Sequence, residues 1–241
     1  MAHGLPDEAN VKGLTTAVNL QDLGELAARL RSPVIFDRRG QVFVVSDFKM
    51  GLDGFDISTN GAGSEVALYA KYDNHYGPVL RLYAVNSASS WAQLVRYVGG
   101  LEQSLLSLGL SLAISSTFLT IEFNITVRRS NIEYTYQWLY DGSDDTLQVL
   151  VSGSTYETVI TNLRIDQEYY RFNYVRFTID DENGLYHEVL INQTAYDLSA
   201  YEPPTASVPA GDYITVSVKA NGSGAEDTEL FLESFILTLG E

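Results

Sequence analysis

The segment from Thr117 to Val127 carries the clearest hydrophobic pattern in the chain. Its apolar side chains alternate with polar ones and are Leu119, Ile121, Phe123, Ile125 and Val127. Period 2 predicts a β-strand with one face in a core and the other in water. Strands of a parallel sheet are covered on both faces and are apolar throughout, so the alternation favours an antiparallel sheet.

Further strand-length segments follow one another through most of the chain, separated by residues that favour turns. They are 34–36, 42–45, 65–72, 79–85, 91–98, 132–138, 146–151, 156–160, 170–179, 185–191, 214–218 and 228–239. Residues 101–112 fit both helical and strand spacing, and we favour a turn followed by a strand. A change of phase near Tyr174 predicts a β-bulge there. This pattern predicts an all-β fold, an antiparallel β-sandwich of jelly-roll type that forms one domain over residues 33–241.

A short amphipathic helix is predicted ahead of the sandwich. Asn19 suits the N-cap position, and Pro33 ends the segment. The apolar stripe consists of Leu20, Leu23, Leu26 and Leu30. So short a helix is marginal alone in water, so we expect residues 1–32 to form an arm that docks, either on the sandwich itself or on a neighbouring subunit.

Composition narrows the functional classes. The chain has 241 residues, no cysteine and a net charge of −16. Residues 131–241 hold 19 acidic and 4 basic residues, whereas residues 1–130 are nearly balanced at 12 and 11. The acidic surface disfavours nucleic acid and anionic membranes as partners. Residues 1–10 lack the features of a signal peptide, and no membrane insertion is expected. We therefore predict that the protein is made in the cytoplasm. We expect it to act in a virion, or outside the cell after lysis.

Three segments resemble the concanavalin-like jelly roll of legume lectins, laminin-G-type modules and carbohydrate-binding modules. Residues 47–55 are similar to the opening D-F-E-x-G-x-x-G-W of such modules, with Phe55 where Trp is usual. Residues 174–192 resemble their W-H-x-V-x-x-x-x-D hairpin, and residues 230–239 resemble their closing V-D-D-V-x-V strand. A docking arm ahead of a jelly roll is also similar in architecture to bacteriophage virion proteins.

The resemblance implies two candidate sites. Asp47 and Glu233 occupy the places of a structural calcium between the first and last strands, the alternative being ordinary surface acids. Separately, the strand 132–138 carries Tyr134, Tyr136 and Trp138, which could form a sugar-stacking platform or belong to the core. No other cofactor is expected.

We predict that the chain is not an enzyme. Glu122 is the only carboxylate on the wet face of the central strand, and glycoside hydrolysis needs two carboxylates across the bond. The leading hypothesis is a structural or decoration subunit of a virion or similar assembly, a homo-oligomer that docks through residues 1–32. The alternative is a lectin-like carbohydrate-binding module that stacks sugars on exposed aromatic rings.

Overall fold

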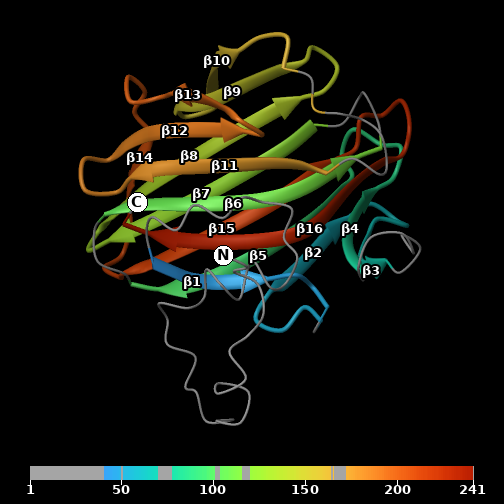
Figure 1. The fold of residues 1–241 in the computed structure, drawn as a ribbon, viewed down its shortest axis with the longest axis horizontal. Coiled ribbons are helices and arrows are strands. Elements are labelled where there is room, and N and C mark those ends of the chain that lie inside the picture. The colour runs from blue at the N-terminus through green and yellow to red at the C-terminus, as the bar shows by residue number, and fades with distance from the viewer. Residues whose placement is uncertain are drawn as a thin grey trace, which may run out of the picture.

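The computed structural model describes residues 41–49, 51–69, 78–100, 104–115, 120–163, 165 and 172–240. Within these residues the regular structure is entirely β-strand, arranged as two antiparallel sheets that lie face to face (Figure 1). None of the described segments forms a helix with the length and hydropathy of a membrane span. The predicted arm over residues 1–32 and its stripe of Leu20, Leu23, Leu26 and Leu30 lie outside the described residues.

The first sheet contains, in spatial order, β13 (Thr194–Asp197), β12 (Leu185–Ile191), β11 (Asn173–Asp180), β6 (Leu105–Ile114), β16 (Thr228–Leu239), β4 (Val79–Ala84) and β3 (Glu65–Tyr69). β1 (Gln41–Ser46) pairs with the C-terminal half of β16. The second sheet contains β10 (Thr155–Ile160), β9 (Thr146–Ser152), β8 (Ile132–Asp141), β7 (Thr120–Arg129), β15 (Tyr213–Asn221), β5 (Trp91–Gly99) and β2 (Asp56–Asn60). β14 (Thr205–Ser207) pairs with β8.

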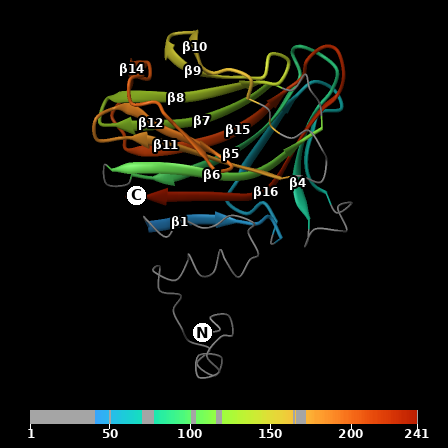
Figure 2. The same ribbon diagram turned by 45° about the horizontal axis from the view of Figure 1, so that its top comes forward.

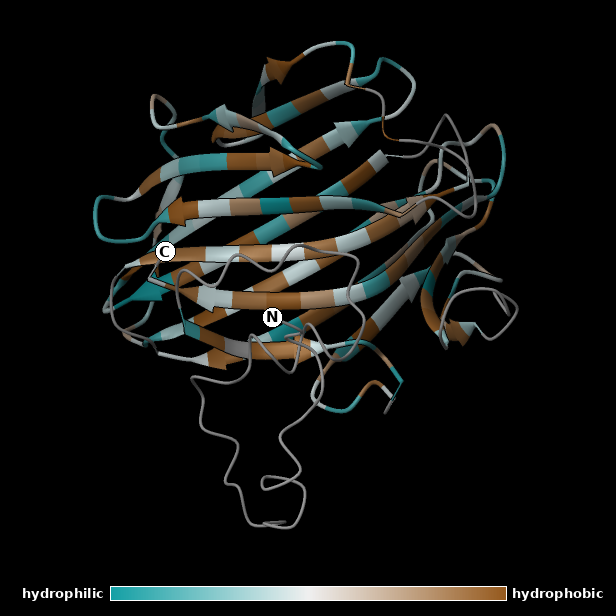
Figure 3. Ribbon diagram, viewed as in Figure 1, coloured by the Kyte–Doolittle hydropathy of each residue, from teal (hydrophilic) through white to brown (hydrophobic). Residues whose placement is uncertain are grey.

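The core lies between the two sheets. Figure 2 shows β6, β16 and β1 of the first sheet below β7 and β8 of the second sheet. Side chains of alternating hydropathy follow one another along most strands, and Figure 3 shows this as alternating bands. Aromatic rings from the two sheets meet in the interior: the Phe177 ring of β11 lies 4.6 Å from Phe123 of β7 and 4.8 Å from Trp138 of β8, between ring centroids. Burial of such large apolar rings is a main source of the stability of a sandwich.

The structure confirms the antiparallel sandwich and the alternation along β7, in which Ile121, Phe123, Ile125 and Val127 are buried. Residues 105–114 form a strand, as favoured for that ambiguous segment. The predicted bulge near Tyr174 is wrong: β11 pairs evenly with β6, and its irregularity lies between Thr178 and Ile179, opposite β12. The tight turn that follows β11 has Gly184 at a φ of +69°, a conformation that glycine adopts without steric cost.

Candidate functional site

The candidate site lies on the outer face of the second sheet, the face turned away from the first sheet. β7 is the central strand of this sheet, and its inward residues fill the core, so its alternate residues Thr120, Glu122, Asn124 and Thr126 point outward. The amino-acid pattern of β7 therefore fixes which of its side chains are available to a ligand.

Antiparallel register aligns the outward residues of neighbouring strands in rows across the sheet. One row consists of Gln93, Lys219, Glu122, Leu139 and Gln148. The adjacent row consists of Asn60, Trp91, Asn221, Thr120 and Asp141. The row on the other side includes Ser217, Asn124 and Gln137. Amides and hydroxyls dominate these rows, so the face offers both donors and acceptors of hydrogen bonds.

Four side chains in these rows form one hydrogen-bonded unit, which we call the Glu122 network: Glu122, Gln137, Lys219 and Asn221. Glu122 Oε1 accepts hydrogen bonds from Lys219 Nζ at 3.0 Å and from Asn221 Nδ2 at 2.9 Å. Glu122 Oε2 accepts one from Gln137 Nε2 at 3.1 Å. The side chains of Glu122 and Lys219 are each 21% exposed, so the pair is fixed in place and still reachable from solvent.

Two aromatic side chains flank the Glu122 network. On one side Trp91 of β5 is half-buried, and Lys219 Nζ lies 5.7 Å from the centre of its ring. On the other side Tyr156 of β10 hydrogen-bonds to Gln137. Burial, and then the charge of Glu122, raises the pKa of Tyr156, so this hydroxyl is neutral and can donate a hydrogen bond at neutral pH.

Support for the network comes from the first sheet through Tyr186 of β12. This buried side chain crosses the interior, and its Oη accepts a hydrogen bond from the backbone N–H of Gln137 at 2.9 Å. The same hydroxyl lies 2.8 Å from the carbonyl oxygen of Leu150 and 3.2 Å from that of Gln137. On this edge, β8 pairs with β9 through residues 138–141 and with β14 through residues 132–134. Tyr186 therefore hydrogen-bonds to the β8 backbone between these two paired segments.

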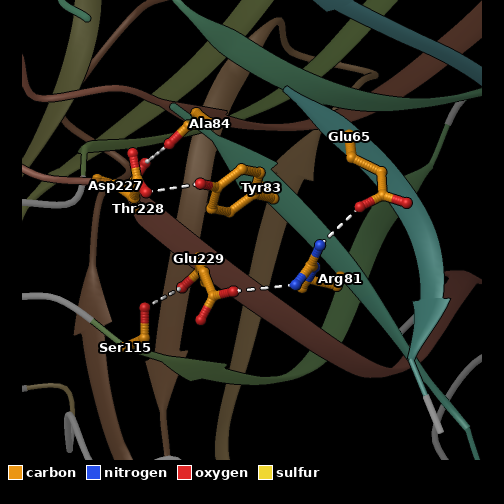
Figure 4. Close-up of polar contacts among 8 residues, drawn as sticks. All are labelled: Glu65, Arg81, Tyr83, Ala84, Ser115, Asp227, Thr228 and Glu229. Atoms are coloured by element: carbon orange, nitrogen blue, oxygen red, sulfur yellow. Dashed lines mark hydrogen bonds and ion pairs between the residues drawn. The ribbon is translucent and has the colours of Figure 1, made fainter. Parts of the chain in front are cut away.

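A second polar cluster lies on the first sheet, at β3, β4 and β16 (Figure 4). Arg81 Nη2 lies 2.6 Å from Glu65 Oε2, and Arg81 Nη1 lies 3.2 Å from Glu229 Oε1. Its guanidinium also lies 4.9 Å from the ring centres of Tyr69 and Tyr83. The two ion pairs of Arg81 join three strands of the first sheet, so we assign this cluster a role in holding β3, β4 and β16 together.

Tyr83 of this cluster donates a hydrogen bond from Oη to Asp227 Oδ2 at 2.6 Å. This bond is the largest influence on both groups: it raises the pKa of Tyr83 and lowers the pKa of Asp227. Asp227 Oδ1 also accepts a hydrogen bond from the backbone N–H of Asn86 at 2.8 Å, so the carboxylate joins β4 to the start of β16.

The predicted sugar platform of Tyr134, Tyr136 and Trp138 is corrected by the structure. Tyr136 and Trp138 are completely buried, because the inward phase of β8 turns their rings into the core against Tyr186. Tyr134 is half-buried and packs against the core and against Tyr136 at 6.5 Å between ring centroids. The core alternative weighed for these residues is the one that the structure favours.

The two predicted calcium ligands have protein partners. Asp47 Oδ2 lies 3.1 Å from Lys49 Nζ, and Glu233 Oε2 accepts a hydrogen bond from Ser111 at 3.0 Å. Among the described residues, no group of three or more His, Asp or Glu side chains is placed to hold a metal ion. The calcium site stays a prediction.

Sequence reasoning missed the partners of Glu122. The pattern showed that Glu122 is outward on β7, yet it could not show that Lys219 and Asn221 lie beside it, almost one hundred residues later in the chain. The signal that could have found them is the matching alternation of residues 214–221, which marks a second strand with one wet face.

The fold resembles that of several solved structures. No protein-family model matches the chain, and no curated protein sequence matches it. The conserved carbohydrate esterase of the Shiga toxin-encoding bacteriophage phi24B superposes with a TM-score of 0.54 at 16% identity, over 83% of this chain and 100% of that chain. The carbohydrate recognition domain of Emp47p gives a TM-score of 0.51 at 13% identity, over 78% and 90%.

A protein named sialidase gives a TM-score of 0.55 at 10% identity, over 84% of this chain but 19% of its own. Identities this low establish the fold alone. At the level of the fold, the predicted antiparallel two-sheet sandwich is confirmed, and the carbohydrate recognition domain of Emp47p is among the structures that share it.

Proposed function

We propose that this protein binds a glycan on the outer face of the second sheet. The observation that carries the proposal is the Glu122 network beside the half-buried ring of Trp91. Sugar rings present hydroxyls around an edge and C–H groups on a face, so a binding site needs fixed polar groups next to an aromatic surface. Trp91 supplies the aromatic surface, and the amides of Asn221 and Gln137 supply fixed polar groups.

Preorganisation supports this reading. Ordering a flexible side chain on binding costs about 0.5–1.5 kcal/mol. Glu122, Gln137 and Asn221 are already held by one another in the free protein, which reduces this cost. The neighbours in fold point in the same direction, because they include a carbohydrate esterase and a carbohydrate recognition domain.

The leading hypothesis from the sequence, a virion decoration subunit, has less support. Its assembly device, residues 1–32, lies outside the described residues, and the neighbouring phage protein is named as an esterase rather than as a structural subunit. Assembly stays a prediction, and light scattering on the full chain and on a version lacking residues 1–32 tests it.

We further propose that binding is non-catalytic. Glu122 is engaged by three donors, and Asp141, the nearest outward carboxylate on β8, accepts hydrogen bonds from the backbone and side chain of Ser143 at 2.9 and 2.6 Å. Both carboxylates therefore have structural tasks. Incubation of the protein with any glycan that it binds should release no shorter product in chromatography.

Tryptophan fluorescence tests the site directly, because the chain has two tryptophans and Trp138 is completely buried. A panel of soluble oligosaccharides, both neutral and charged, is titrated into the full chain. Binding should change the emission of Trp91, and Trp91→Ala should weaken the affinity roughly tenfold, which corresponds to about 1.4 kcal/mol.

The matched control is Tyr97→Ala, which removes an exposed ring from the same strand about 20 Å farther along and should leave binding unchanged. The proposal is wrong if no glycan in the panel binds, or if Trp91→Ala binds as tightly as the unmodified protein.

A further inference from the structure

We infer that the glycan site selects uncharged sugars, and that Glu122 is the residue that determines this selectivity. The inference rests on the proposed function and adds the substrate class. It starts from the basic side chains, because a carboxylated or sulfated glycan is normally held by Lys or Arg.

The register places two basic side chains on the described outer face of the second sheet, Lys219 and Arg128. Each is already paired with an acid. Lys219 Nζ lies 3.0 Å from Glu122 Oε1, and Arg128 Nε lies 3.7 Å from Glu133 Oε2. Arg128 also lies over the ring of Tyr213, at 5.0 Å from the ring centre.

Among the described residues of this face, acidic groups outnumber basic ones. Besides Glu122 and Glu133, the register turns Asp56 and Asp141 outward. An anionic sugar placed over Trp91 would therefore approach Glu122 at close range and would find Lys219 neutralised. Like charges at such distances repel strongly where water is partly excluded, whereas a neutral sugar meets no such repulsion and can form hydrogen bonds with the amides of the network.

The selectivity depends on Glu122, because Glu122 neutralises the charge of Lys219. The ammonium of Lys219 lies over the Trp91 ring, 5.7 Å from the ring centre, where a sugar carboxylate could be received. Glu122→Gln keeps the size and one acceptor oxygen of the side chain but removes its charge. Lys219 then becomes an unpaired cation within the site, so the variant should accept anionic sugars that the unmodified protein rejects.

The test uses the neutral oligosaccharide that binds best in the panel and the same oligosaccharide with its C6 hydroxyls oxidised to carboxylates. The unmodified full chain should bind the oxidised form at least about tenfold more weakly than the neutral form. Glu122→Gln should reduce that ratio by at least about tenfold, mainly by tighter binding of the oxidised form. When the best ligand lacks a C6 hydroxyl, the pair is that ligand and its glucuronate-substituted form.

The matched control is Asp56→Asn, which makes the same change of charge on the same face at an exposed residue of β2. It should leave the ratio unchanged, because Asp56 lies two strands away from β15 and is aligned with Ser217 rather than with Lys219. If it changes the ratio as much as Glu122→Gln does, overall charge rather than the Glu122–Lys219 pair sets the preference.

The outcomes separate the two proposals. Absence of any binding in the panel overturns the proposed function. Binding of a neutral glycan together with equal binding of its oxidised form, or an anionic glycan as the best ligand, overturns the inference and leaves the proposed function standing. Unchanged rejection by a folded Glu122→Gln variant overturns the role assigned to Glu122.

Discussion

Removal of one buried hydroxyl, in Tyr186→Phe, should destabilise the protein by roughly 2–4 kcal/mol. The ring of Tyr186 stays in place in this variant, so packing against Tyr136 and Trp138 is retained. The loss comes from Tyr186 Oη, which accepts from the backbone N–H of Gln137 at 2.9 Å and lies 2.8 Å from the carbonyl oxygen of Leu150. A buried donor left without a partner costs about 1–3 kcal/mol, and the lost bond to the carbonyl adds about 1 kcal/mol.

Tyr136→Phe is a matched control for this change. Tyr136 is also completely buried and contacts Tyr186 at 5.4 Å between ring centroids. Its hydroxyl has no hydrogen-bond partner within the described part of the chain. Burial of that hydroxyl raises the pKa of Tyr136 well above its ordinary value. Removal of a buried polar group that lacks a partner abolishes a desolvation penalty, so Tyr136→Phe should be as stable as the unmodified protein or more stable.

Urea denaturation followed by tryptophan fluorescence measures both variants, since Trp138 lies 5.1 Å from Tyr186 between ring centroids. The midpoint of Tyr186→Phe should fall while the slope of the transition stays unchanged. In thermal denaturation the same loss corresponds to a decrease of roughly 5–15 °C in Tm. The reasoning is refuted if Tyr186→Phe lies within about 0.5 kcal/mol of the unmodified protein, or if Tyr136→Phe loses as much as Tyr186→Phe.

Two further predictions concern the first sheet. Tyr83→Phe should raise the pKa of Asp227 toward its ordinary range, because it removes the hydrogen bond at 2.6 Å that holds that pKa down, and carboxyl NMR titration measures this. The pKa of Asp227 is lower in the folded state than in the unfolded state. The stability that Asp227 contributes is therefore present above the unfolded pKa and is lost as the pH falls through the folded pKa. In Tyr83→Phe this loss of stability at low pH should be smaller. If Asp47 and Glu233 hold calcium, addition of calcium should raise Tm and Glu233→Gln should abolish the increase; an identical Tm with calcium and with chelator would contradict the site.

The sheets could be predicted from the sequence because burial imposes a period on each strand. Ile121 to Val127 on β7 and Ile214 to Val218 on β15 alternate so regularly that their inward faces are fixed before any pairing is known. The bulge was misplaced because a change of phase can also arise when both faces of a strand are covered. Residues 175–179 of β11 are all buried, so the hydropathy of a residue there does not indicate which face of the strand it is on.

The candidate site could be predicted only in part. Whether an aromatic residue on a strand faces a ligand or the core depends on which face the neighbouring strands cover. Tyr134, Tyr136 and Trp138 share a face that looks suited to sugar stacking, but the first sheet covers that face. Trp91 could not be predicted as a site residue, because polar and apolar residues alternate only weakly along its strand. What makes Trp91 a candidate is its contact with Lys219 of the adjacent strand. Such long-range pairing is set by topology, which local periodicity does not encode.

The same topology explains why the candidate site depends on both sheets. Gln137 presents its side chain to Glu122 on the outer face, while its backbone is held from the interior by Tyr186 of the first sheet. A hydroxyl that crosses the core thus fixes the position of a side chain on the opposite surface. The polar groups on the outer face of the second sheet therefore need no flexible loop to arrange them. They are already positioned by the register of β7, β8 and β15 and by the hydrogen bond from Gln137 to Tyr186.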